Sequence, residues 1–384
     1  MISQYKASFT AVAFACFLAA CGGGGADTTP VANITAVKVV GDSLSDSGTF
    51  GYKFTVQGTA PTSTGSTALW VDRVAASYNQ TLCAHYASSD GVSFVSKAQC
   101  TNYAVGGGRI NNFTAPTLPI SITQQLKDAG AAGYSASDLL LVDGGANDAG
   151  DLIAAYLNAA VDGGVAYQTV LGTVLDAATL QALLTSGPTG SAQAGGAYMK
   201  KLAAQFAATL KANALDKGAT RIAILNVPDF LLTPKFQLLL GSIAQAKGAE
   251  ASAQVAALFD SWIQAFNTQL SASFAGDSRV TVVDFNASSK EQAQNPVKYG
   301  LTNLINTACP VTGQGGDGLP SYTFPTCTAA ALSAKPPAGV TGGADWWKHY
   351  AFSDGFHPTP YVHELMGDLV SRSLSQAGWA LSSQ

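Results

Sequence analysis

The sequence alternates short aliphatic runs with longer segments that have the apolar spacing of helices, and this alternation constrains the fold more than any other feature. Five runs are rich in β-branched or aliphatic residues and are bounded by turn residues, which predicts buried strands. They are Ala36–Val40, Thr101–Val105, Leu139–Val142, Arg221–Asn226 and Val280–Phe285. Strands that alternate with helices form a mostly parallel sheet covered on both faces, so the chain is expected to be an α/β protein.

The segments between these runs are predicted to be helices. Ala68–Tyr78 has apolar residues at helical spacing, Ala197–Ala214 is rich in Ala, and Pro234–Phe274 has room for one long helix or two. Thr359–Ala377 is predicted to be a closing helix, because the prolines at its start suit a first helical turn. Two segments are less regular. Asp151–Gly195 is expected to be an insertion that can form helices, and Asn286–Tyr350 is expected to be an ordered loop region.

The composition favours one large globular domain. Of the 384 residues, 47% are hydrophobic and only 11% are charged, so the chain can bury a large core and is not expected to be disordered. The net charge of −4 argues against nucleic acid as a partner, because binding phosphates requires a basic face. No linker is evident after Pro30, and residues 35–384 are expected to form a single domain.

Residues 1–21 have the pattern of an export signal. Lys6 precedes a mostly apolar run that is too short to span a membrane and is typical of a signal-peptide core. The run ends in Leu18-Ala19-Ala20-Cys21, which resembles the bacterial lipobox and implies that Cys21 is lipidated. Residues 22–34 are then expected to be a flexible tether. The alternative is an ordinary cleaved signal peptide in which Cys21 has no role.

This pattern predicts an exported protein of a Gram-negative-type bacterium. It would be an outer-membrane lipoprotein, or a cell-surface or secreted protein, and any membrane attachment would be through the lipid at Cys21. Four further cysteines are present at positions 83, 100, 309 and 327, and an even number in an exported chain predicts disulfides. Of the three pairings, the sequence-local one, Cys83–Cys100 with Cys309–Cys327, is the simplest. Their spacing does not suit zinc.

Small and polar residues directly follow the first three predicted strands. The three turns are Gly41-Asp42-Ser43-Leu44-Ser45-Asp46-Ser47-Gly48, Gly106-Gly107-Gly108 and Asp143-Gly144-Gly145-Ala146-Asn147-Asp148. In an open parallel sheet, ligands bind beyond the carboxyl ends of the strands. These turns are therefore expected to share one edge of the sheet and to form the site. Asp46 and Asp148 are interpreted as residues that hold the turns by hydrogen bonds rather than as acids.

A serine in such a turn becomes a nucleophile only when a base takes its proton and a third group orients that base. His357 is the best candidate base, because Asp354 three residues earlier can fold back onto its Nδ1 and leave Nε2 for Ser43. The alternative is that Asp354 only caps the closing helix and His357 is a surface residue. His349 and His363 lie nearby in sequence, but three converging ligands are not evident, so no metal or cofactor is expected.

An acyl-transfer site also needs donors for the developing oxyanion. The backbone N–H groups of Ser43 and of a glycine after the second strand are suitable, and the side-chain amide of Asn147 is a third donor. Each of these residues, taken alone, is also explained as an ordinary turn residue. Two aromatic groups lie near these residues in sequence. Trp346, Trp347 and Tyr350 are predicted mainly to pack in the core, with a lipid groove as the alternative, and Phe50, Tyr52 and Phe54 are predicted to form either an entrance wall or a buried edge.

Four blocks of the sequence, in the order of the family, resemble the GDSL (SGNH) hydrolases, which are serine esterases and lipases. They are Gly41 to Gly48, Asn102-Tyr103-Ala104-Val105-Gly106-Gly107, Gly145-Ala146-Asn147-Asp148 and Asp354-Gly355-Phe356-His357-Pro358-Thr359. The resemblance implies a three-layer α/β/α flavodoxin-like fold with a five-stranded, mostly parallel sheet. It also implies that Ser43 is the nucleophile, His357 the base and Asp354 its partner. The implied oxyanion hole is Ser43, Gly107 and Asn147, with Gly106 a close competitor of Gly107.

The expected function is hydrolysis of a small-molecule or lipid carboxylic ester through an acyl-enzyme. An acyltransferase differs only in the acceptor of the acyl group and remains an alternative. A catalytically inactive surface lipoprotein that binds a ligand is an alternative from a different class. The sequence gives no indication of acyl chain length or oligomeric state.

Overall fold

The computed structural model describes residues 33–58 and 67–379. Its central sheet has four parallel strands in the order β1 (Ala36–Val40), β4 (Asp138–Val142), β5 (Ile222–Leu225) and β6 (Val280–Val283). The predicted α/β class with a parallel sheet is therefore confirmed. The predicted signal peptide, Cys21 and most of the predicted tether lie outside the described residues, and Ile34 at the end of the tether is buried.

The prediction of five strands was wrong, because Thr101–Val105 does not form a strand of the sheet. Asn102 makes single bridges to Val39 on one side and to Ala84 on the other, so the segment lies along the outer edge of β1 without forming a ladder. The side chain of Asn102 makes its own hydrogen bonds, and its Oδ1 accepts from the N–H of Ala104 at 2.9 Å. Its Nδ2 donates to the carbonyl of Ser45 at 2.7 Å. Backbone bonds from Tyr103 to Val39 and from Val105 to Gly41 still hold the segment beside β1, and the Asn102 side chain ties it to the turn that follows β1.

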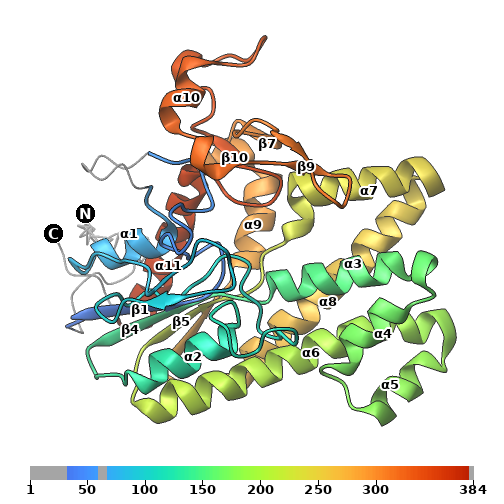
Figure 1. Cartoon of the computed structure of the whole chain (residues 1–384), viewed down its shortest axis with the longest axis horizontal. Helices are drawn as coiled ribbons and strands as arrows, with labels where there is room; N and C mark the ends of the chain where they lie inside the picture. The colour runs from blue at the N-terminus through green and yellow to red at the C-terminus, as the bar shows by residue number, and fades with distance from the viewer. Residues whose placement is uncertain (1–32, 59–66, 380–384) are drawn as a thin grey trace, which may run out of the picture.

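The two faces of the sheet are covered by different helices, which gives three layers (Figure 1). Leu140 and Val142 of β4 belong to a core shared with α2 (Ile122–Ala131), α6 (Gly187–Asn213) and α8 (Ala249–Ser273). Leu139 and Leu141 belong to a second core shared with α1 (Trp70–Ala76) and α11 (Pro360–Gln376). Successive side chains of a strand point to opposite faces, so one apolar strand supplies both cores.

The long predicted helix Pro234–Phe274 is two helices, α7 (Pro234–Lys247) and α8, separated by Gly248. Gly248 has φ +91°, a conformation that glycine adopts without strain and that ends a helix. The closing helix is confirmed as α11, and the Oγ1 of Thr359 accepts from the N–H of Val362 at its start. The predicted insertion is helical, and its helices extend to the right in Figure 1; they are α3 (Ala146–Asp162), α4 (Val165–Gly172), α5 (Ala177–Leu184) and the start of α6.

The segment expected to be an ordered loop, Asn286–Tyr350, contains more regular structure than the sequence indicated. It begins within α9 (Phe285–Gln294), which starts where the last predicted strand was expected to end, because the side chain of Asp284 caps it. The shorter elements are β7 (Asn303–Thr307), β8 (Gly313–Gln314), β9 (Pro320–Ser321), α10 (Ala329–Ala334) and β10 (Tyr350–Phe352). β10 pairs with β7 in parallel.

Two disulfides, Cys83–Cys100 and Cys309–Cys327, join the cysteines that are closest in sequence, which is the simplest of the pairings considered. The first lies beside the hairpin of β2 (Tyr86–Ala87) and β3 (Val95–Ser96). The second belongs to a third core with Trp346, Trp347 and Tyr350. These three aromatic side chains are buried, so they pack beneath the loops, as their main interpretation held, and do not form a lipid groove.

Within residues 33–58 and 67–379, no helix combines the length and the apolar composition that crossing a membrane requires.

Candidate active site

Ser43, His357 and Asp354 form a continuous hydrogen-bonded chain. Ser43 lies in the turn after β1, and its Oγ is 2.8 Å from Nε2 of His357. The Nδ1 of His357 is 2.9 Å from Oδ2 and 3.0 Å from Oδ1 of Asp354. The structure thus brings together three residues from opposite ends of the sequence, in the arrangement that activates a serine.

Asp354 is held in place by its own loop. Its Oδ1 accepts from the backbone N–H groups of Phe356 at 2.8 Å and His357 at 2.6 Å. Burial acts to raise the pKa of Asp354, but the positive charge of His357 and these hydrogen bonds outweigh burial, so the net shift of the pKa is downward. Asp354 therefore remains ionised and can orient the imidazole of His357.

Two buried carboxyl groups lie behind the Ser43 turn. Asp42 accepts from the N–H of Leu44 at 3.0 Å, and Asp143 accepts from the hydroxyl of Ser45 at 2.5 Å. Burial raises the pKa of both carboxyl groups, and the neighbouring charge of Asp42 raises that of Asp143 further, well above its usual range. A Cβ on Gly41 would lie 1.8 Å from Oδ1 of Asp143, so the close approach of the two turns requires glycine here.

The three glycines after Val105 differ in what their N–H groups do. The N–H of Gly106 donates to Oδ2 of Asp46 at 2.8 Å, and that of Gly108 donates to the carbonyl of Val105 at 2.9 Å. Gly107 has φ +76°, and in the described part of the chain its N–H has no hydrogen-bond acceptor. Of the three, Gly107 is the one whose N–H is available to a ligand.

Asn147 lies in the first turn of α3, next to the same glycines. Its Nδ2 donates to the carbonyl of Gly108 at 2.9 Å and lies 3.4 Å from Oδ2 of Asp42. Gly145 caps the helix with φ +101°, which places the Asn147 side chain at the carboxyl edge of β4. The turns after β1 and β4 and the glycine run therefore meet at one edge, as the sequence predicted.

The glycine run is tied to α3 by ionic and hydrogen-bonded contacts. Arg109 binds both carboxylate oxygens of Asp151, at 2.5 and 3.0 Å, and the carbonyl of Gly107 at 2.6 Å. Asp148 accepts from the N–H groups of Ile110 and Asn111 at 3.0 and 2.8 Å. These contacts fix the position of Gly107 relative to α3. Asp148 therefore holds a loop in place, as expected, but its bonds are to a distant segment rather than to its own turn.

Aromatic rings surround the imidazole of His357. The ring of Phe54 lies 5.2 Å from it, that of Phe324 lies 5.5 Å away and that of Phe356 lies 5.6 Å away, measured between centroids. Phe50, Tyr52 and Phe54 also contact one another. Of the two interpretations of this group, a wall beside the site is the one that the structure favours.

An open cleft of about 950 Å³ leads to the site. His357 and Asn147 line it together with side chains of α3, α7 and the β8–β9 turn. Arg109, Lys235 and Asp317 place charges of both signs on its wall. The cleft therefore carries charges of both signs on a wall that also includes apolar side chains, and it is open to solvent at the imidazole. We call it the polar cleft.

The other histidines lie outside this arrangement. His85 bonds the carbonyl of Cys100 at 2.9 Å, and His349 packs against Tyr361 at 4.4 Å between ring centroids. His363 is fully buried, and its Nδ1 accepts from the N–H of Trp70 at 3.4 Å. Within residues 33–58 and 67–379, no group of three or more His, Cys, Asp or Glu side chains is placed to hold a metal ion.

The buried His363 is expected to make the stability of the fold depend on pH. Burial, aided by the charge of Arg73, lowers the pKa of His363 from 6.5 to about 3. The imidazole stays neutral in the folded chain but takes a proton in the unfolded chain, so its contribution to stability is present above about pH 6.5 and is lost as the pH falls towards about 3. Between about pH 7.5 and pH 4.5 the loss should be about 3 kcal/mol.

Urea unfolding at both pH values measures this loss. The His363→Gln variant has no titrating group here, so its unfolding free energy should fall by about 3 kcal/mol less than that of the unaltered protein over the same pH interval. Because each protein is compared with itself, a general destabilisation of the variant does not affect the result. Equal pH dependence in the two proteins would contradict the assignment.

Several residues of the site were not singled out from the sequence. The sequence places Asp143 only in a turn, although Val40 and Val142 are register partners and the residues that follow them, Gly41 and Asp143, are therefore neighbours. The ring of Phe324 and the ion pair between Arg109 and Asp151 come from segments that carry no recognisable motif. Only the tertiary structure brings them to His357 and Gly107.

The match to known families agrees with this geometry. The model of the GDSL-like Lipase/Acylhydrolase family matches residues 37–370, a stretch that includes the four-stranded sheet and all of Ser43, Asn147, Asp354 and His357. A search among functionally curated proteins finds no match to the chain. Because the family match covers well over half of the sequence, the chain belongs to the GDSL-like lipase/acylhydrolase family, and this membership supports the hydrolysis of esters as its function.

Proposed function

We propose that this protein hydrolyses carboxylic esters through an acyl-enzyme formed on Ser43. The observation that carries the proposal is the unbroken chain of hydrogen bonds from Ser43 Oγ through His357 to the carboxylate of Asp354. Such a chain lets the imidazole accept the serine proton while the carboxylate stabilises the resulting positive charge. His357 is the general base in this proposal, and Asp354 orients it.

In the first half of the reaction, Ser43 Oγ bonds to the ester carbonyl carbon and its proton passes to Nε2 of His357. The bond to the alcohol then breaks, and the same proton passes to the departing oxygen. In the second half, water attacks the acyl-enzyme, its proton passes to Nε2 and then to Ser43 Oγ, and the carboxylic acid is released. The scheme uses only side chains of this protein and water.

Three donors are proposed to stabilise the oxyanion: the N–H of Ser43, the N–H of Gly107 and the side-chain amide of Asn147. Gly107 is favoured over Gly106 because the N–H of Gly106 is already bonded to Asp46. A Cβ on Gly106 would also lie 2.2 Å from the ring of Phe54, so this glycine is needed for packing. Arg109 holds the carbonyl of Gly107, so the N–H of Gly107 needs no reorganisation when charge develops, which makes it effective. The amide of Asn147 must exchange its long bond to Asp42 Oδ2, at 3.4 Å, for the oxyanion.

Substitution of Asn147 with alanine is expected to lower kcat by about 100- to 1,000-fold, because one of three oxyanion donors is lost. KM should change little, since the donor acts mainly on the transition state. Initial rates over a range of ester concentrations separate kcat from KM. Asn306→Ala on the exposed surface of β7 is the matched control and should leave both constants unchanged. A loss confined to KM would contradict the role of Asn147.

A fluorophosphonate probe tests the proposed nucleophile directly. The probe should label the folded protein once, and mass spectrometry of the digested protein should locate the label on the peptide that contains Ser43. Heat-denatured protein is the control and should not react, because an unactivated serine is a poor nucleophile. Labelling of another serine, or no labelling of protein that hydrolyses esters, would contradict the proposal.

We further propose that the protein is exported and anchored by lipid at Cys21. The two disulfides within the described residues support this, because disulfides persist mainly in oxidising compartments. Growth with a labelled fatty acid should label the protein and not its Cys21→Ser variant, and the labelled protein should fractionate with membranes. Unlabelled protein in the growth medium would support an ordinary cleaved signal peptide instead.

A further inference from the structure

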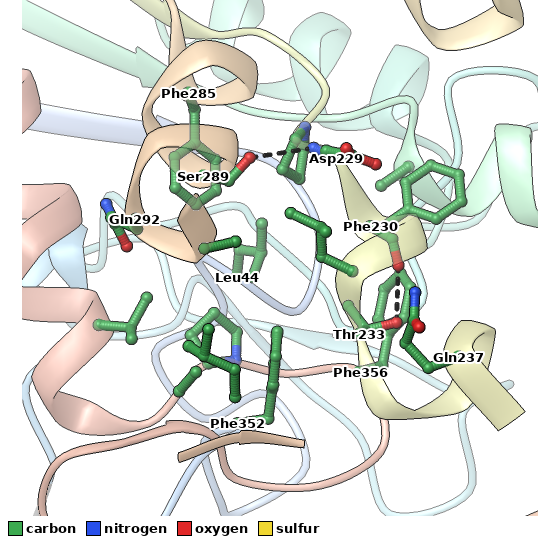
Figure 2. Close-up of a pocket in the computed structure, with 18 of the residues that line it drawn as sticks. Leu44, Asp229, Phe230, Thr233, Gln237, Phe285, Ser289, Gln292, Phe352 and Phe356 are labelled. Carbon is green, nitrogen blue, oxygen red and sulfur yellow. Dashed lines mark hydrogen bonds between the residues drawn. The ribbon is translucent and has the colours of Figure 1, made fainter. Parts of the chain in front are cut away.

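A second pocket, distinct from the polar cleft, adjoins the site. It has a volume of about 300 Å³ and lies between the turn after β1, the start of α7, α9 and β7. Figure 2 shows Leu44 near its middle, with Phe285, Phe352 and Phe356 around it. Further apolar side chains complete the lining, among them Leu232, Leu301, Leu304 and Ile305. The pocket is therefore mainly a hydrophobic cavity.

The polar side chains of this pocket are mostly bonded to their own chain. Thr233 donates to the carbonyl of Phe230 at 2.7 Å, and Gln237 donates to that of Leu231 at 2.7 Å. Ser289 donates to the carbonyl of Asn286 at 2.9 Å. Asp229 differs, because its Oδ1 has no hydrogen-bond partner in the described part of the chain, and burial raises its pKa. A polyhydroxylated ligand would find few partners here apart from Asp229, whereas an alkyl chain would bury the apolar lining. The raised pKa of Asp229 favours its neutral form beside such a chain.

The position of the pocket relates it to the reacting atoms. Asp42 and Leu44, which line it, are the neighbours of Ser43, and Phe356 and Pro358 are the neighbours of His357. Ala146 and Phe356 also line the polar cleft, so these two side chains lie at the boundary between the two spaces. Ser43 itself lines neither space, and we place an ester carbonyl at Ser43 Oγ at this boundary, between the apolar pocket and the cleft.

Proton transfer decides which part of the ester enters which space. His357 must pass its proton to the departing alcohol, so the alcohol lies on the side of the imidazole. His357 lines the polar cleft and does not line the apolar pocket. The alcohol is thus assigned to the cleft, and the acyl chain is left with the apolar pocket.

We propose that this pocket binds the acyl chain of medium-chain aliphatic esters, an inference that rests on the proposed function of Ser43. A dry apolar cavity of about 150 Å³ holds a benzene molecule, which has six carbons. A pocket of about 300 Å³ therefore accommodates an acyl chain of about 8 to 12 carbons by the same measure. Ile305, which is 78% exposed, marks a rim where a longer chain leaves the pocket.

A series of p-nitrophenyl esters from acetate to palmitate tests this assignment on the unaltered protein. The kcat/KM value should rise by about fourfold for each methylene that enters the pocket. The rise should stop at about 8 to 12 carbons, when the pocket is full. A profile that is flat, or that falls steadily from acetate, would overturn the assignment.

Filling the pocket should shift this profile. Ala293 lines the pocket on α9, and Ala293→Phe introduces a ring that takes up about half of its volume. The ratio of kcat/KM for decanoate to that for acetate should fall at least about 30-fold, and the rise should stop at about six carbons. Ala287→Phe adds the same ring to an exposed position of the same helix and should leave the ratio unchanged.

A second measurement does not depend on the folding of any variant. Alkylphosphonate p-nitrophenyl esters phosphonylate the serine irreversibly, with p-nitrophenolate as the leaving group, so the rate of inactivation of the unaltered protein should increase from the methyl to the octyl compound. If the fluorophosphonate probe labels Ser43 but the chain length of ester and phosphonate has no effect, the acyl pocket is wrong and the proposed function stands. If neither esters nor probes react, the proposed function itself fails.

Discussion

Replacement of Ser43 with alanine is expected to lower kcat for ester hydrolysis by at least about 10,000-fold. The substitution removes the one oxygen that bonds Nε2 of His357, at 2.8 Å, so no group remains to form the acyl-enzyme. The residual rate should come from water activated by His357 and from the oxyanion donors, which still stabilise the transition state. KM should change much less than kcat, because the pockets that bind the ester are intact.

The measurement is the initial rate of hydrolysis of a p-nitrophenyl ester by the purified variant, with fluorophosphonate labelling in parallel. Only one oxygen atom is removed, and its hydrogen bond is to His357, so the fold should be retained, and the thermal unfolding midpoint of the variant checks this. Ser271→Ala on the exposed side of α8 is a matched serine control and should retain full activity. Full turnover in the Ser43→Ala variant would show that another residue is the nucleophile.

The second large effect is expected for Asp354→Asn, which should lower kcat by about 1,000- to 10,000-fold. Asp354 accepts from His357 Nδ1 and from two backbone N–H groups. An asparagine can keep the backbone bonds through its oxygen, but its amide group then faces Nδ1 and favours the wrong tautomer of the imidazole. The imidazolium that forms during the reaction would also lose its counter-charge.

The kcat/KM value measured from about pH 5 to pH 10 distinguishes orientation from simple destabilisation. The Asp354→Asn variant should keep its fold but hydrolyse esters better at high pH, where hydroxide assists the serine. Asp345→Asn changes an exposed carboxylate in the same way and should have no effect on the profile. An Asp354→Asn variant that retains a tenth or more of the original kcat would exclude Asp354 as the partner of His357.

The sheet edge could be predicted from the sequence because both of its causes are local. β4 is apolar at every position except its first, and β1 is mostly apolar, so each strand is recognisable without its neighbours. The turns that follow them carry glycine and small polar residues, which are ordinary turn residues when taken singly but recur here at the end of successive strands. Since parallel strands place their carboxyl ends together, Ser43 and Asn147 had to meet.

The acyl pocket could not be predicted, because no stretch of the sequence contains it. Leu44, Phe230, Phe285 and Leu301 are ordinary apolar residues, and each would suit a packed core equally well. Their common cavity exists only because η2 (Phe230–Leu232), α9 and β7 pack beside one turn. The failure to predict α9 had a local cause, since the apolar run of β6 continues in sequence into Phe285 while Asp284 starts a helix.

Ser43 and His357 are 314 positions apart in the sequence, and this separation has a consequence for biosynthesis. A chain that has emerged only as far as β6 already has the serine, the glycine run and Asn147, yet it has no base to take the serine proton. Every shorter or incompletely folded species is therefore inert towards esters, including those of any membrane that it encounters before it is complete. Recovery of activity after dilution from urea would accordingly report the docking of the segment between β10 and α11, and not the earlier assembly of the sheet.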